Sequence, residues 1–183
     1  MPAFQGFQVL RFDARGHGDS DTPPGPYSLE MMARDLRELC DALQLDQVHV
    51  CGVSLGGQVA QTFALEYPER VNSLVLVNTT CEYDKEQTQA WRQRAATALD
   101  QGMSVLHESL LARWFTEKAA EQRIPGYVYM ESVVTRMSAA AFHAGCAAMC
   151  MLNTTARLPA INAPTLIIAT PDDPGAPRAV SEK

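Results

Sequence analysis

The chain has 183 residues, of which 46% are hydrophobic and 20% charged, so its composition predicts one soluble domain with a single buried core. A net charge of -6 without runs of lysine or arginine argues against nucleic acid or an anionic membrane as a partner, while a small anionic substrate stays compatible with it. The sequence shows no signal-peptide pattern and no apolar run that approaches the length of a membrane span.

The cysteine content indicates a reducing compartment. The chain has an odd number of cysteines in apolar surroundings: Cys40, Cys51, Cys81, Cys146 and Cys150. This pattern favours small buried side chains over a disulfide framework and predicts a cytoplasmic location. Cys146 and Cys150 lie one helical turn apart, but a metal site would need further ligands that the nearby sequence does not offer, so we expect none.

The chain opens with a pattern of strand, loop and helix. Residues 7–12 form a short apolar run that predicts a strand, and the glycine-punctuated stretch 13–20 predicts a loop. Ser28 fits the N-cap of a helix that reaches Leu43, because apolar residues recur there at helical spacing.

The pattern Gly52-Val53-Ser54-Leu55-Gly56 is the most informative feature of the sequence. It follows an apolar run over 48–53, which predicts a second strand, and it opens a helical pattern over 55–67. Glycines two positions before and after a serine fit a sharp turn where a strand and a helix crowd each other. Such a turn places Ser54 at the positive end of the helix and aims the Leu55 backbone N–H at a developing oxyanion. The sequence therefore predicts that Ser54 is the nucleophile of an acyl transfer and that Leu55 belongs to the oxyanion hole.

Further along, strands alternate with helices in a way that predicts a mostly parallel, buried sheet. A third strand is expected over 71–77 and a fourth within 163–169. The segment between them is rich in alanine, glutamine and methionine, and we expect three or four short helices in it, divided at Gly102, Pro125 and Gly126.

This order of elements predicts one discontinuous α/β domain. Residues 1–83 form the core with the serine turn, 84–156 form a helical lid, and 157–183 return to the core. An insertion between sheet strands is a natural lid over the carboxyl edge of the sheet.

Asp173 follows the last expected strand and fits the acid of a catalytic triad, because the acid comes after the nucleophile in the chain order of such a turn. Its carboxylate would accept a hydrogen bond from an imidazole, fix the tautomer of that ring and stabilise the imidazolium. The alternative is an ordinary loop aspartate between Pro171 and Pro174. Three other carboxylates could take its place: Asp172, Glu82 and Asp84.

No histidine follows the expected acid, so the base that would activate Ser54 is not where the chain order requires it. His49 lies on the same expected strand, about 16 Å from the serine at the rise of a strand, which is too far for a hydrogen bond. We expect His17 to be bonded within a tight turn, and His107 and His143 to pack or face solvent in the lid. Without a base a serine hydroxyl is a weak nucleophile.

Several stretches resemble 3-oxoadipate enol-lactonases of the alpha/beta-hydrolase superfamily, and together they cover nearly the whole chain. The resemblance rests on residues 7–20, on Cys51–Gly57, on Pro68–Val71, on Arg113–Thr116 and on Ala163–Leu166. The serine turn is generic to the superfamily. The Arg-Trp-Phe-Thr and Pro-Gly-Pro-Tyr runs narrow the resemblance to the lactonases.

The resemblance implies a partial alpha/beta-hydrolase fold, with a mostly parallel sheet and a helical lid insertion. It also implies a cytoplasmic hydrolase of aromatic-acid catabolism that uses no metal or organic cofactor. Enzymes of this family hydrolyse an enol-lactone that carries a free carboxylate and give 3-oxoadipate. That carboxylate could pair with Arg113 while the Trp114 indole covers the lactone ring. The alternative is a solvated Arg113 and a Trp114 in the core.

Compared with this family, the chain looks truncated at both ends. It begins at a strand that in the family follows earlier strands and a His-Gly loop with the second oxyanion N–H, and it stops before the last strand and the catalytic histidine. We therefore expect a gap in the sheet between the strands at 7–12 and 48–53. Residues 1–183 alone are expected to be poorly soluble or partly molten, and inactive.

Three functions are compatible with these patterns. The first is a serine hydrolase of an enol-lactone or carboxylic ester, in which Asp173 orients a histidine from outside the chain. The second is a truncated, catalytically silent homologue with only a binding or vestigial role. The third is a generic esterase or perhydrolase. Comparing the products formed from an enol-lactone with those formed from an aryl ester would distinguish the third function from the first.

Overall fold

A three-stranded parallel sheet forms the centre of the computed structural model, which describes residues 5–171, 173 and 175. Strands β1 (Val48–Val53), β2 (Val71–Val77) and β3 (Thr165–Ile168) lie in the order β1-β2-β3. Val53 pairs with Val77, and Val77 with Ile168, so all three strands end at one edge. The strands predicted over 48–53 and 71–77 are confirmed, and the last one is shorter than predicted.

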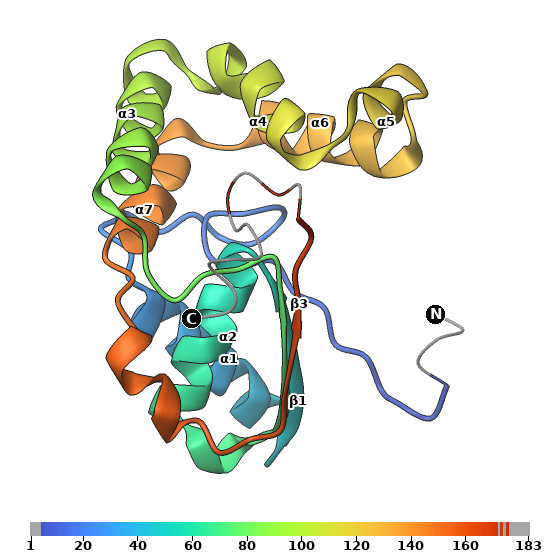
Figure 1. The fold of residues 1–183 in the computed structure, drawn as a ribbon, viewed down its shortest axis with the longest axis vertical. Coiled ribbons are helices and arrows are strands. Elements are labelled where there is room, and N and C mark those ends of the chain that lie inside the picture. The colour runs from blue at the N-terminus through green and yellow to red at the C-terminus, as the bar shows by residue number, and fades with distance from the viewer. Residues whose placement is uncertain (1–4, 172, 174, 176–183) are drawn as a thin grey trace.

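Two helices cover one face of this sheet (Figure 1). The first, α1 (Leu29–Ala42), is capped by Ser28 as predicted, since the Ser28 hydroxyl accepts a hydrogen bond from the Met31 N–H at 3.1 Å. The second, α2 (Leu55–Glu66), starts directly after Ser54. Both helices pack on β2 through one apolar cluster, in which Phe63 and Leu74 are at most 1% exposed. This cluster fixes the position of α2 relative to the strand ends.

The chain between β2 and β3 builds a layer of helices above the carboxyl edge of the sheet (Figure 1). These helices are α3 (Lys85–Gln101), α4 (His107–Trp114), α5 (Glu117–Glu121), α6 (Pro125–Arg136) and α7 (Ala139–Cys150). Short 3-10 helices cover Pro68–Arg70 (η2), Met103–Leu106 (η3) and Thr155–Ala160 (η4).

The helix boundaries in this layer follow from its caps. Gly102 ends α3 with a φ of 84° and Pro125 begins α6, which confirms two of the predicted breaks. The prediction of three or four helices is too low, because Thr116 and Ser138 also act as N-caps, of α5 and α7. A single threonine or serine is a weak boundary signal in a sequence.

Helix α7 joins the lid to the rest of the molecule. Phe142 and Cys146 belong to the apolar cluster inside the lid, whereas Ala144 and Ala148 pack against α1 and α2. Just after this helix, the Thr154 hydroxyl donates a hydrogen bond of 2.7 Å to the buried side-chain oxygen of Gln61 in α2. The lid is therefore attached by both apolar packing and a buried polar contact.

The opposite face of the sheet has no second layer within the described residues. Val53, Leu166 and Ile168 lie on it with 59%, 56% and 43% of their surface exposed. Residues 5–12 pass on this side of the sheet in Figure 1. The strand predicted over 7–12 is wrong: the segment forms no ladder with any described strand, and Phe7 is 62% exposed. An extended segment needs a hydrogen-bonded neighbour to become a strand, and β1 is the edge of the described sheet, where we expected a gap.

The cysteines follow the same division of the sheet. All five are free; Cys40, Cys81 and Cys146 are buried as predicted, and Cys150 is half-buried. The prediction is wrong for Cys51, which is exposed because it lies on the uncovered side of β1. No helix in the described part of the chain is long and apolar enough to cross a membrane.

Candidate active site

Ser54 sits on a strained turn between β1 and α2. Its backbone adopts φ 52° and ψ −116°, a conformation that residues with a side chain rarely adopt. Three hydrogen bonds hold it there. The Ser54 N–H donates to the Val77 carbonyl at 3.0 Å, and the Ser54 carbonyl accepts from the Gln58 N–H at 3.1 Å and from the Thr79 hydroxyl at 2.7 Å. The end of β2 and the first turn of α2 thus fix the serine.

The glycines around the serine have different roles. A Cβ on Gly52 would overlap the Gly56 carbonyl oxygen, so the tight crossing of strand and helix requires glycine at position 52. A Cβ on Gly57 would lie 2.6 Å from the Thr79 Cβ. The predicted crowding at Gly56 is wrong, because a Cβ there would meet no atom within 4 Å. What Gly56 supplies is the backbone that Gly52 approaches.

The side chain of Ser54 is available for chemistry. Ser54 is exposed, and although it is the N-cap of α2, its hydroxyl makes no capping hydrogen bond. Leu55 is the first residue of that helix, so its N–H has no acceptor within the helix. The turn therefore presents a hydroxyl beside the positive end of a helix, as a nucleophile next to an oxyanion site requires.

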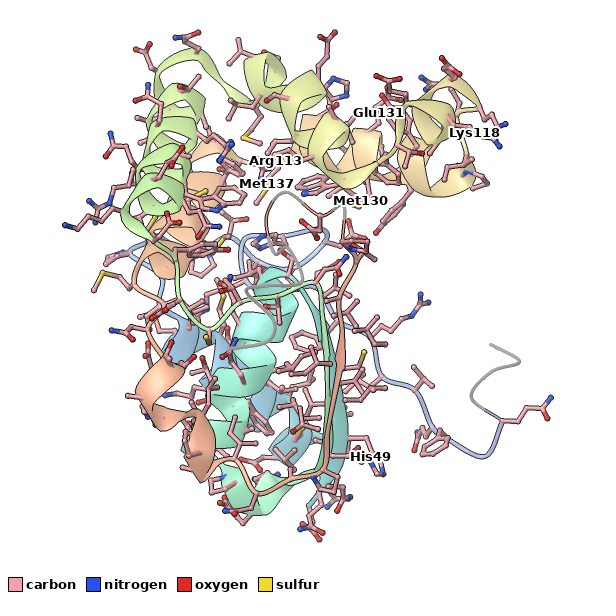
Figure 2. All side chains as sticks on the ribbon, viewed as in Figure 1. His49, Arg113, Lys118, Met130, Glu131 and Met137 are labelled. Atoms are coloured by element: carbon pink, nitrogen blue, oxygen red, sulfur yellow. The ribbon has the colours of Figure 1, made fainter. Side chains whose placement is uncertain are left out.

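None of the four histidines hydrogen-bonds Ser54 in the part of the chain that the structure describes. His49 lies on β1 at the end far from the lid, and its Nδ1 is 2.7 Å from the Ser73 hydroxyl (Figure 2). The His17 Nδ1 is 3.0 Å from the Arg15 carbonyl oxygen, within the loop as expected. His107 approaches Glu131 at 3.9 Å inside the lid, and His143 is exposed.

The loop after β3 brings Asp173 to the same edge of the sheet as Ser54. Its Oδ1 accepts a hydrogen bond of 2.7 Å from the Gly175 N–H. The loop is tied to the end of β2, because the Asn78 side-chain oxygen accepts a hydrogen bond of 3.0 Å from the Thr170 N–H. The acid candidate and the nucleophile candidate thus follow the ends of two strands that are separated only by β2.

The other acid candidates are placed differently. The Asp84 carboxylate has a structural role, because it caps α3 and accepts a hydrogen bond of 2.7 Å from the Gln87 N–H. Glu82 pairs with Asn153 through an isolated antiparallel bridge, where the chain enters and leaves the lid. Asp172 lies outside the described residues. Among the described acid candidates, Asp173 is the one in the loop after β3.

The expected substrate residues lie on the last turn of α4. Arg113 is half-buried on the side of the lid that faces the sheet (Figure 2), and its Nη2 would lie 3.4 Å from a Cβ on Gly175. Trp114 is 45% exposed. The indole near Arg113 belongs to Trp91 of α3, whose ring centre is 5.8 Å from the Arg113 Cζ.

Sequence reasoning missed several residues between the serine and the lid. The Tyr83 hydroxyl accepts a hydrogen bond of 2.7 Å from the side chain of Gln58, one turn after Ser54. Burial raises the pKa of this hydroxyl to about 12, and the hydrogen bonds from Gln58 and Trp91 act against that rise. The available signal for these residues was a polar side chain on a largely buried helix: Gln58 is 1% exposed. Among the described residues, no group of three or more metal-ligating side chains comes together.

A strained serine between a parallel strand and a helix, below a helical lid, defines the class of this protein. The family described as alpha/beta hydrolase fold matches residues 1–183, and the chain belongs to this family. The predicted fold class is thereby confirmed.

Individual relatives sharpen the comparison. The chain is 33% identical over 166 residues to 3-oxoadipate enol-lactonase 2 of Acinetobacter baylyi, which covers 91% of this chain and 61% of that protein. Among solved structures, a hydrolase from Pseudomonas aeruginosa PA01 superposes with a TM-score of 0.93 at 36% identity, over 99% of this chain and 68% of that one. The enol-lactonase from Burkholderia xenovorans LB400 gives 0.87 at 29% identity, over 93% and 65%. The resemblance to enol-lactonases is confirmed, and the chain spans about three fifths of the length of the curated relatives.

Proposed function

We propose that this chain carries the nucleophile and the acid of a serine hydrolase that cleaves an enol-lactone or a carboxylic ester. The observation that carries the proposal is the Ser54 turn, where a strained backbone presents a hydroxyl that caps nothing. The similarity to 3-oxoadipate enol-lactonase 2 and to the Burkholderia enol-lactonase supports a lactone as the substrate. Five free cysteines suit a cytoplasmic location.

In the proposed reaction the Ser54 oxygen attacks the lactone carbonyl carbon, and the carbonyl electron pair moves onto oxygen beside the Leu55 N–H. Collapse of this intermediate breaks the ring C–O bond, and the released enol oxygen takes the proton that the serine gave to the base. The enol becomes a ketone while the acyl group stays on Ser54. Water, activated by the same base, then hydrolyses the acyl-serine ester and leaves a second carboxylate.

The base in this proposal is a histidine from outside residues 1–183, held by Asp173. The four histidines of the chain are engaged elsewhere or exposed, as described above. A carboxylate at the carboxyl edge of the sheet, in the loop after β3, can accept a hydrogen bond from an imidazole that enters between this loop and Ser54. The proposed ligand is a small anionic lactone or ester, with Arg113 pairing with its carboxylate and Trp114 covering its ring.

The test compares two substrates and two proteins. The protein translated from the whole gene is assayed with 3-oxoadipate enol-lactone and with a neutral aryl ester, beside its Ser54→Ala variant. We expect the lactone to be hydrolysed, and the rate to fall at least about a thousandfold in Ser54→Ala with an unchanged melting temperature. Residues 1–183 alone should be no faster than that variant, because they lack a base at the serine.

Two outcomes would replace the proposal. A strong preference for the aryl ester would favour the generic esterase or perhydrolase. No hydrolysis above the Ser54→Ala background, in a well-folded protein from the whole gene, would favour the catalytically silent homologue.

A further inference from the structure

Two arginines from different lid helices lie against one indole. The Cζ of Arg94, on α3, is 4.9 Å from the ring centre of Trp91, one turn before it on the same helix. The Cζ of Arg113, on α4, is 5.8 Å from the same ring centre. The indole thus gathers two guanidinium groups at one place on the lid.

Neither of these guanidinium groups forms an ion pair with a described carboxylate, although the Asp173 carboxylate lies near Arg113. Three other arginines are half-buried, and each forms an ion pair with a carboxylate: Arg15 with Asp35, Arg37 with Glu38 and Asp41, and Arg70 with Asp41. Arg94 and Arg113 are half-buried as well, but no described carboxylate lies within ion-pair distance of either. Burial and then the Arg113 charge lower the pKa of Arg94, so the two cations are close enough to repel each other.

Two unpaired, half-buried cations are costly unless an anion joins them. The cation–π contacts with Trp91 offset only part of this cost. A carboxylate between the two groups would accept hydrogen bonds from both and would replace their repulsion by attraction. The arrangement therefore has the features of a preformed anion site.

Contacts link this cluster to the helix that follows Ser54 and to the loop that carries Asp173. On one side, Trp91 neighbours the Tyr83 hydroxyl, which is bonded to Gln58 one turn after Ser54. On the other side, the Arg113 Nη2 and the Asp173 Oδ1 both lie within 3.4 Å of the position that a Cβ on Gly175 would take. An anion held here would therefore lie near the loop that carries the acid candidate.

We propose that Trp91, Arg94 and Arg113 form a two-guanidinium site for the carboxylate that the substrate keeps throughout the reaction. The inference rests on the proposed function and extends it, because it assigns Arg94 and Trp91 a role and makes the enzyme selective for acids over neutral esters. Arg94 and Arg113 hold the carboxylate from two helices, and Trp91 fixes both side chains. None of the three takes part in bond breaking.

The experiment measures binding instead of turnover. In the Ser54→Ala variant of the protein from the whole gene, the dissociation constant of adipate is measured by calorimetry at low ionic strength. Adipate has the chain length of the expected product and a carboxylate at each end, and dimethyl adipate is its neutral match. We expect adipate to bind, Arg94→Gln to raise its dissociation constant at least tenfold, and Arg94→Lys to raise it less.

Arg92→Gln is the matched control, since it removes the same charge from an exposed position on the same helix. It should change the dissociation constant less than twofold, and all variants should keep the melting temperature of the parent within a few degrees. Equal effects of Arg94→Gln and Arg92→Gln on the dissociation constant of adipate would overturn the inference. Dimethyl adipate that binds as strongly as adipate, and with the same sensitivity to Arg94→Gln, would also overturn it. So would the absence of any adipate binding.

The failure of this inference is distinguishable from the failure of the proposed function. Adipate binding that depends on Arg94, without hydrolysis of the lactone by the unsubstituted protein, would remove the proposed function alone. Lactone hydrolysis that depends on Ser54, with adipate binding indifferent to Arg94→Gln, would remove only the two-guanidinium site.

Discussion

Two serines of this chain divide the requirements of a hydrolase between them. Ser54, at the end of β1, has a strained backbone, a helix N-terminus beside it and a crowded glycine before it, but no described histidine hydrogen-bonds it. Ser73, in the middle of β2, has the His49 Nδ1 at 2.7 Å, but it lies in a strand on the uncovered side of the sheet. Ser54 has the backbone geometry of a nucleophile, whereas Ser73 has only the contact with a histidine.

The difference indicates which part of an active site the fold must build. Around a serine in a regular strand, the backbone N–H groups donate hydrogen bonds to the neighbouring strands, so no donor is left for an oxyanion. A histidine can approach Ser54 from another part of a protein. A helix N-terminus and a strained turn, in contrast, must be formed by the residues next to the serine itself. We therefore assign the chemistry to Ser54, and the predictions below test how strongly the two regions differ.

The glycine turn gives the largest expected effect on stability. Gly52→Ala should lower the free energy of unfolding by about 3 kcal/mol or more, because its Cβ would overlap the Gly56 carbonyl and backbone would have to move. Gly56→Ala is the control, and it should be neutral or stabilise by up to about 1 kcal/mol, because its Cβ would meet open space on a helix. Urea unfolding of both variants checks this. Similar losses would show that the tight crossing is not specific to position 52.

The two faces of the sheet should respond differently to the same truncation. Leu74→Ala, on the helix-covered face, should cost about 3 kcal/mol, because the side chain is 1% exposed. Leu166→Ala, on the uncovered face, should cost less than about 1 kcal/mol, since that side chain is 56% exposed. Urea unfolding again measures both. Equal costs in this chain would mean that something covers the second face in solution.

Alkaline pH should destabilise the packing of the lid helices. Burial raises the pKa of the Cys146 thiol from 9.0 to about 12. The folded state therefore keeps this proton up to about pH 12, while the unfolded chain releases it above pH 9. The stability that the neutral thiol contributes is complete below pH 9 and is lost as the pH rises to 12, by on the order of 2 kcal/mol at pH 11. Tyr83 acts in the same direction from pH 10 upward.

Unfolding free energies measured from pH 8 to 11 test this linkage. Cys146→Ala should flatten the decline, and Cys51→Ala, which removes a thiol from the exposed face, should leave it unchanged. A decline of the same steepness in Cys146→Ala would show that the buried thiol is not its source.

The parts of the site that the sequence predicts are those with a local cause. The serine turn is encoded by adjacent residues. Ser28 begins a helix through its own side chain, and Gly102 ends one through its own backbone. The prediction of a strand over 7–12 failed because a strand depends on a hydrogen-bonded neighbour, which no described segment provides. The capping role of Asp84 at the start of α3 was likewise not part of the sequence prediction, which considered this carboxylate only as an acid candidate.

The lid residues show the same limit more clearly. Arg113 was predicted together with Trp114, its neighbour in sequence, but the indole it approaches is that of Trp91. Trp91 and Arg113 come together because α3 and α4 fold onto one apolar cluster, and no spacing in the sequence records that packing. Whether a half-buried arginine has a carboxylate within ion-pair distance is known only when the positions of all its neighbours are known.

The most direct test of the assignment to Ser54 is the position of a covalent label. The protein from the whole gene is treated with a serine-directed phosphonate, digested, and analysed by mass spectrometry for the modified peptide. The account predicts a label on Ser54 that disappears in Ser54→Ala and persists in Ser73→Ala, with both variants folded. A label on Ser73, or one that survives Ser54→Ala, would contradict it, because the contact with His49 would then matter more than the strained turn.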